Sequence, residues 1–128
     1  MARKKSLNLT EGEQRLMEVL WEQGPATVAE VAEALPKTLG LAYNTVLTTL
    51  RILDEKGYVR HTKPKDGRAF LYTPIVTREQ ASKSALRTLL SRFFSNSPEA
   101  LVLNILEDEK LSGEERERIR RLLKEGSK

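Results

Sequence analysis

Residues 42–74 read AYNTVLTTLRILDEKGYVRHTKPKDGRAFLYTP, and this stretch decides the fold. Its first half repeats apolar residues at the spacing that gathers them on one face of a helix, namely Val46, Leu50 and Leu53. This spacing predicts a helix from Ala42 to Lys56. We expect Gly57 to end it, because glycine readily adopts the left-handed conformation of a helix C-terminus.

A β-hairpin is predicted directly after this helix. Residues 58–62 and 69–74 are rich in valine, tyrosine, phenylalanine and threonine, which favour strands. The connection between them contains Pro64 and the pair Asp66-Gly67, and such residues are typical of a tight turn.

Two shorter helices precede the stretch. Each begins at a capping box, in which a threonine hydroxyl and a glutamate three residues later satisfy backbone N–H groups: Thr10 with Glu13, and Thr27 with Glu30. Gly24-Pro25 ends the first helix and Pro36 ends the second. Three helices followed by a hairpin form the order of a winged helix-turn-helix, which we expect in residues 1–75.

The remaining residues, 76–128, predict three more helices, so the fold class is mainly α with a small β-hairpin. Their apolar stripes include Leu89, Phe93, Leu101, Ile105, Ile119, Leu122 and Leu123. About fifty residues in short helices are marginal for an independent core, and dimerisation is the usual remedy. We therefore expect a helical dimerisation region of a homodimer. The alternative is that these helices fold back on the winged domain of the same chain.

Composition excludes several classes of protein. The 128 residues are 39% hydrophobic and 31% charged, as in a soluble globular protein. No stretch approaches the ~20 apolar residues of a membrane span, and no apolar segment follows the basic N-terminus as in a secretory signal. The chain has no cysteine, so disulfides and thiolate metal sites are excluded, and we expect a cytoplasmic protein without metal or cofactor.

The charge pattern favours double-stranded DNA as a partner. Between Lys56 and Arg68 there are five basic residues and one histidine against one acid, within a chain of net charge +4. A helix that enters the major groove needs short polar side chains to reach base edges, and a basic hairpin beside it can contact phosphates. Both features also have an explanation without DNA. The polar face of the helix can simply be exposed to solvent, and the lysines of the hairpin can protect a strand edge from aggregation.

The predicted DNA contacts fall into three groups. The helix of residues 42–56 supplies Tyr43, Asn44, Thr45, Thr48 and Arg51. The hairpin, or wing, supplies Arg60, Lys63, Lys65 and Arg68. An N-terminal arm adds Arg3, Lys4 and Lys5.

Four segments of the chain resemble the penicillinase and methicillin-resistance repressor family (BlaI/MecI type). They are LTEGEQRLMEVLWEQGPATVAEVAEAL at 9–35, AYNTVLTTLRILDEKGYVRH at 42–61, GRAFLYTP at 67–74 and SPEALVLNILEDEKLSGEERERIRRLLKE at 97–125. The resemblance covers nearly the whole chain. It implies a homodimer that sits on inverted repeats in promoters and blocks transcription in antibiotic resistance.

The resemblance also implies a candidate proteolytic site. In sensor-coupled members of the family, a protease cuts the dimerisation region after an asparagine followed by phenylalanine. The matching pair here is Asn104-Ile105, in which isoleucine replaces the aromatic residue. A membrane sensor protease is the partner that this site implies.

Three other functions compete with this interpretation. An enzyme is disfavoured, because the single histidine, His61, lies in the basic hairpin and no nucleophile motif is present. A ligand-sensing regulator of the multiple-antibiotic-resistance type shares the winged helix, but it usually begins with a long dimerisation helix, and only about nine residues precede the first capping box here. A winged helix that binds only proteins predicts no salt-dependent binding to duplex DNA.

Overall fold

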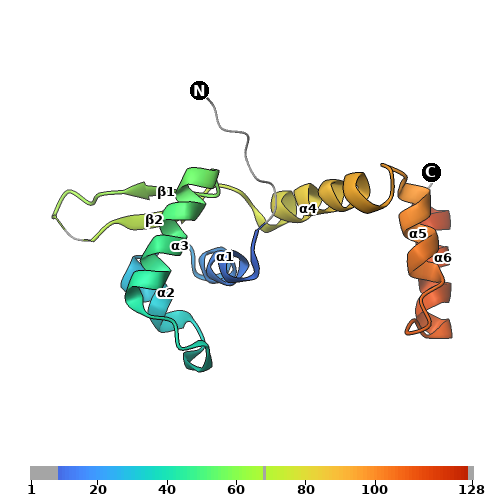
Figure 1. The fold of residues 1–128 in the computed structure, drawn as a ribbon, viewed down its shortest axis with the longest axis horizontal. Helices are drawn as coiled ribbons and strands as arrows, with labels where there is room; N and C mark the ends of the chain where they lie inside the picture. Colours follow the sequence, from blue (N-terminus) through green and yellow to red (C-terminus); the bar gives the residue numbers. More distant parts are fainter. Residues whose placement is uncertain (1–8, 68, 127–128) are drawn as a thin grey trace. The chain divides into compact units, whose positions relative to one another are not determined.

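The computed structural model describes residues 9–67 and 69–126, so the predicted contacts Arg3, Lys4, Lys5 and Arg68 lie outside the described residues. Six α-helices, one short 3₁₀ helix and a two-stranded antiparallel sheet make up this part of the chain, and the predicted mainly α fold with a hairpin is confirmed (Figure 1). In chain order the elements are α1 (Glu11–Gln23), α2 (Val28–Ala34), η1 (Lys37–Leu39), α3 (Tyr43–Lys56), β1 (Val59–Thr62), β2 (Leu71–Pro74), α4 (Arg78–Phe93), α5 (Pro98–Leu106) and α6 (Gly113–Gly126).

The chain divides into two compact units between Ala85 and Leu86. This division falls within α4, because the first turns of α4 pack with the winged domain through Ala81. The domain boundary at residue 75 stays a prediction. None of the helices in the described residues is long and apolar enough to cross a membrane.

Capping boxes start the helices where the sequence predicted them. At the start of α1 the Glu13 backbone N–H donates to the Thr10 hydroxyl at 3.1 Å, and the Thr10 N–H donates to the Glu13 carboxylate at 2.9 Å. The same reciprocal pair of hydrogen bonds occurs at three further helix starts, formed by Thr27 with Glu30, Thr77 with Gln80, and Ser112 with Glu115. These side chains satisfy amides that the first turn of a helix leaves without a partner.

The core of the first unit is built around α3, which packs against α1, α2 and β1 (Figure 1). The predicted inner face of α3 is confirmed, since Val46, Leu50 and Leu53 are at most 1% exposed. They meet the buried faces of the other elements, which consist of Leu16, Met17, Leu20, Val28, Val31, Leu35, Tyr58, Val59 and Tyr72. Burial of side chains of this size contributes about 1.5–3 kcal/mol each to folding.

The hairpin pairs Val59 with Pro74 and Thr62 with Leu71 at its two ends. Gly67 has a φ of +77° in the connecting turn, a conformation that glycine adopts without strain. Tyr72 of β2 also exchanges two backbone hydrogen bonds with Ala26, at 2.8 and 3.0 Å. This isolated antiparallel β-bridge, which the sequence analysis missed, joins the segment before α2 to the hairpin.

The second unit contains the end of α4 together with α5 and α6. The left-handed residues Ser95 and Asn96 end α4, Ser97 caps α5, and Pro98 stands in its first turn. Arg116 of α6 donates to the backbone carbonyl of Leu106 at 2.6 Å, which ties α6 to the end of α5.

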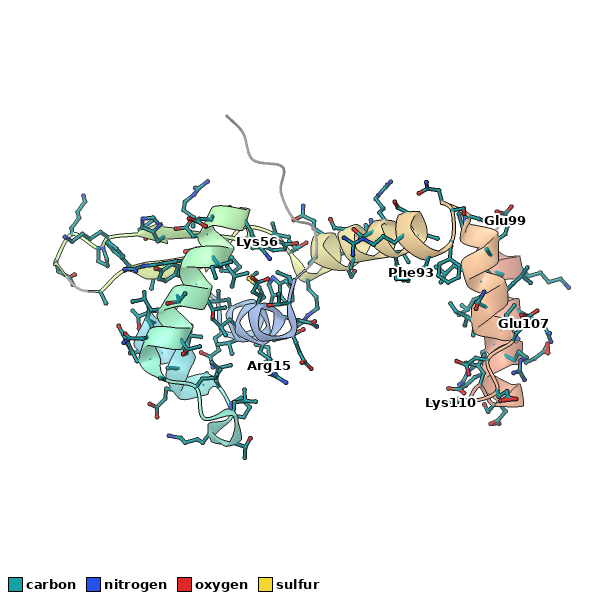
Figure 2. The ribbon with its side chains drawn as sticks, in the orientation of Figure 1. Arg15, Lys56, Phe93, Glu99, Glu107 and Lys110 are labelled. Atoms are coloured by element: carbon teal, nitrogen blue, oxygen red, sulfur yellow. The ribbon has the colours of Figure 1, made fainter. Side chains whose placement is uncertain are left out.

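A partly buried ion pair links α3 to the start of α1. The Nζ of Lys56 donates to Oε1 of Glu13 at 2.7 Å, and the same oxygen accepts the N–H of Thr10 (Figure 2). Burial works to raise the pKa of the Glu13 carboxyl. The hydrogen bonds from Lys56 and Thr10 and the charge of Lys56 outweigh burial, so the pKa lies below its usual value. A carboxyl whose pKa is lowered by folding stabilises the fold above its unfolded pKa, and this stability is lost as the pH falls through the folded pKa.

The variant Glu13→Gln tests this pair. At neutral pH it should lower the free energy of unfolding by about 2 kcal/mol, because Lys56 loses its buried anionic partner. The difference from the wild type should shrink as the pH falls through the folded pKa, as urea unfolding at several pH values would measure. The control is Glu11→Gln, which breaks the exposed pair with Arg15 and should cost less than about 0.5 kcal/mol. Equal losses for both variants would contradict the role of the buried pair.

Candidate nucleic-acid interface

The connection between α2 and α3 sets the position of the predicted recognition helix. Pro36 follows α2, and the chain then forms the 3₁₀ turn η1, which the sequence analysis did not predict. Gly40 closes this turn with a φ of +61°. The chain can therefore reverse within a few residues and begin α3 at Tyr43, with Ala42 as its N-cap.

One face of α3 is exposed along its first three turns. The predicted contacts on this helix all lie there, and all are exposed: Tyr43, Asn44, Thr45, Thr48 and Arg51. The amide of Asn44 and the hydroxyls of the threonines are groups that pair with base edges in a major groove. Burial of the opposite face leaves this polar face directed away from the domain.

The N-terminus of α3 differs from those of α1, α2 and α5. Its N-cap is Ala42, which supplies no side-chain hydrogen bond, whereas the other three helices are capped by a threonine or a serine. The amide end of a helix dipole carries partial positive charge and attracts anions such as phosphate. The start of α3 thus combines polar side chains with a favourable field for DNA.

Arg51 is held by the hairpin. Its side chain lies close enough to that of Tyr72, a buried residue of β2, to act on the Tyr72 hydroxyl. Burial raises the pKa of the Tyr72 hydroxyl above its ordinary value, although the charge and hydrogen bond of Arg51 act in the opposite direction. Arg51 therefore connects α3 to the wing, a role that the sequence analysis did not assign.

A second connection between α3 and the wing is made by His61. Its Nδ1 pairs with the carboxylate of Asp54 in α3, and its ring lies 5.2 Å from the ring of Phe70, measured between centroids. The ring centroid of Tyr72 is 6.2 Å away. The wing is thus joined to the recognition helix through side chains of both strands.

The wing presents the remaining predicted cations. Arg60, Lys63 and Lys65 are exposed, and Arg60 lies on the face of β1 opposite the buried Val59. In the part of the chain that the structure describes, no group of histidine, aspartate and glutamate is arranged to hold a metal ion. The described surface is therefore a polar helix face beside a cationic hairpin.

Comparison with known proteins identifies the family of this chain. The family model described as "Penicillinase repressor" matches residues 9–125. The chain belongs to the penicillinase repressor family. The resemblance found in the sequence is confirmed.

Individual relatives of the repressor agree with this assignment. The penicillinase repressor of Bacillus licheniformis is 33% identical over 122 residues, which cover 95% of this chain and 94% of the relative. The transcriptional regulator BlaI of Mycobacterium tuberculosis is 32% identical over 115 residues, covering 88% of this chain and 80% of the relative. Among solved structures, the DNA-binding domain of the repressor BlaI is 31% identical with a TM-score of 0.51, and the match covers 60% of this chain and 93% of that one.

The candidate proteolytic pair of the repressor lies inside α5. Asn104 is exposed, and its side-chain amide donates to the carbonyl of Ala100 at 3.3 Å. Ile105 is also exposed and lies one residue before the end of the helix. Cleavage at this pair, and a membrane sensor protease that performs it, stay predictions.

The predicted dimerisation residues include the two most exposed large apolar side chains of the described residues. Phe93, labelled in Figure 2, lies at the end of α4. Its side chain is 73% exposed, and that of Leu122 is 67% exposed. Leu89, Ile105 and Leu123 are exposed as well, whereas Leu101 and Ile119 are half-buried.

Exposed apolar residues also lie at the interface, and the predicted DNA contacts did not include them. Ile52 of α3 is 38% exposed, and Leu41, just before this helix, is 39% exposed. Helical spacing places Ile52 beside the polar face of α3, because it follows Thr45 by seven positions and Thr48 by four. Phe70 of the wing is exposed too, beside His61.

The two parts of the interface should respond differently to substitution. Lys63→Ala with Lys65→Ala should weaken binding to all duplexes to a similar degree and reduce the salt slope by about 2, because phosphate contacts release counterions. Asn44→Ala should alter the preference among sequences, at a cost of about 1–3 kcal/mol on the preferred site. Fluorescence anisotropy on a panel of duplexes at several salt concentrations measures both effects.

The matched control for the wing is Lys110→Ala, which removes a cation from the loop between α5 and α6 (Figure 2). It should leave the salt slope unchanged. A wing variant that behaves like Lys110→Ala would refute the phosphate contacts.

Proposed function

We propose that this chain, a DNA-binding transcriptional repressor of the penicillinase repressor family, acts as a homodimer on an inverted-repeat operator. The observation that carries the proposal is the exposed polar face of α3 beside a wing that Arg51 and His61 join to that helix. The match to the solved DNA-binding domain of BlaI supports it, because that domain shares the fold and 31% of its residues with this chain.

Each part of the interface has its own task in the proposed complex. The helix α3 enters the major groove, where Asn44, Thr45 and Thr48 contact base edges and Ile52 packs on thymine methyl groups. The cations of the wing, Lys63 and Lys65 among them, contact phosphates and add affinity without sequence information. No residue is assigned a catalytic role.

The exposed apolar side chains of the second unit support the homodimer. Between Leu86 and Gly126 no side chain is fully buried, although the helices carry many large apolar residues. Large exposed apolar side chains gathered in one region are typical of a protein interface. A two-fold dimer also presents two recognition helices to two half-sites about one DNA turn apart, or a multiple of it.

Selection of bound duplexes from a random pool tests the proposed function. We expect recovery of an inverted repeat whose footprint covers two half-sites, with affinity that falls steeply as salt rises. Failure to enrich any sequence, together with weak binding that disappears at moderate salt, would overturn the proposal and favour a protein-interaction module.

The dimer interface is tested by Phe93→Asp combined with Leu122→Asp. Each change places a charge on an apolar position that the dimer should bury, so sedimentation should show monomers. Both residues lie outside the first unit, whose thermal unfolding should stay unchanged. The control Ser91→Asp adds a charge to α4 at an exposed polar position and should leave the dimer intact. A double variant that remains dimeric would disprove the assignment of these residues.

A further inference from the structure

We infer that the pair between His61 of the wing and Asp54 of α3 is a proton-dependent contact that positions the wing for DNA, so the repressor binds DNA more tightly at about pH 6 than at pH 8. The inference deepens the proposed function and rests on its contacts between the wing and phosphates. His61 and Asp54 are positioning residues, because Lys63 and Lys65 supply the proposed phosphate contacts and neither member of the pair does so.

The first observation is the place of the pair in the winged domain. Asp54 lies near the end of α3, and His61 lies in β1, where it is paired with Tyr72 of β2. The Nδ1 atom of His61 contacts Oδ2 of Asp54, and β1 packs against α3 (Figure 1). The strand that carries His61 continues directly into the turn with Lys63. A contact at His61 therefore sets how the cationic part of the wing lies beside the recognition helix.

The second observation is the environment of the two side chains. The ring of His61 lies near two aromatic rings of the hairpin, those of Phe70 and Tyr72, at centroid distances of 5.2 and 6.2 Å. The side chain of His61 is 50% exposed and that of Asp54 is 28% exposed. The imidazole can thus exchange protons with water, while the carboxylate is mostly covered. A partly covered carboxylate responds more strongly to a change of charge beside it than a fully solvated one does.

The third observation concerns the other charged or titratable groups around His61. They are Asp54 and Arg51 of α3, Tyr72 of β2, and Arg60 and Lys63, which lie next to His61 along the wing. Burial raises the pKa of the Tyr72 hydroxyl, so this group stays uncharged at neutral pH. Arginine, lysine and aspartate side chains ordinarily keep one charge state between about pH 6 and pH 8, whereas histidine changes its own there. The chain has a single histidine, so His61 is the side chain that changes charge in this cluster.

The physical consequence follows from the charge of the imidazole. A protonated His61 attracts the Asp54 carboxylate and compensates its charge. A neutral imidazole can still donate one hydrogen bond to the carboxylate, but the attraction is weaker and the negative charge beside the wing is uncompensated. That charge repels DNA phosphates. Both effects lower the affinity for DNA as the pH rises, and by linkage the binding of DNA takes up protons in this range.

The test measures the affinity of the full-length repressor for its selected operator by fluorescence anisotropy, at constant ionic strength. Between about pH 6 and pH 8 the Kd of the wild type should rise about threefold to tenfold, because a partly exposed ion pair changes binding a few-fold at each of two wings. In His61→Gln, which keeps a polar side chain, the Kd should change less than about 1.5-fold over the same range. Calorimetry in buffers of different ionisation heat should show proton uptake for the wild type and less for this variant.

The variant Asp54→Asn separates the pair from a direct contact of His61 with phosphate. It removes the charge that His61 compensates, so its affinity should exceed that of the wild type at about pH 8, and most of the pH dependence should be lost. A direct contact between His61 and phosphate would instead keep the full pH dependence in Asp54→Asn. The matched control is Glu55→Gln, which removes a negative charge from an exposed position of the same helix and should keep the pH profile of the wild type.

Thermal unfolding at each pH verifies that the variants are folded. A wild type whose affinity is the same at both ends of the pH range would overturn the inference, as would an Asp54→Asn variant with the pH profile of the wild type. If Lys63→Ala with Lys65→Ala lost no affinity at either pH, the proposed phosphate contacts of the wing would fail instead, and the inference with them.

Discussion

Burial of one face of α3 is the constraint on which the rest of the structure depends. Val46, Leu50 and Leu53 fill the centre of the first unit, and α1, α2 and β1 pack around them. Because a helix has one face opposite its buried face, this packing places Asn44 and Thr48 on the surface. The same contacts that stabilise the domain therefore present the residues that read DNA in the proposed complex.

The two ends of α3 serve different purposes. The first turn lacks a side-chain cap and carries short polar residues, as a helix that meets phosphates and bases requires. The last turns carry Arg51, Asp54 and Lys56, which contact Tyr72, His61 and Glu13. Charged residues near the end of the helix thus hold the wing and α1 in place, while the start of the helix remains open to a partner.

The second unit buries little apolar surface of its own. Its helices are well capped, yet between Leu86 and Gly126 no side chain is fully buried. Local hydrogen bonds can form a helix, but apolar burial must stabilise its packing. In the proposed dimer a second copy supplies that burial, and α4 joins it to the winged domain through a linker that Trp21 and Tyr58 hold.

The sequence by itself determined the helices, the hairpin, the inner face of α3 and the capping boxes, because each depends on residues a few positions apart. It also indicated the family, and the polar contacts of α3 lie on the surface as expected. Tertiary structure decided the pairing of Tyr72 with Ala26, the tether of Arg51 to Tyr72 and the contact of Trp21 with Arg78. The two residues of each contact are separated by 21 to 57 positions in the sequence, so local spacing does not reveal them. Only the packing of the elements brings these residues together.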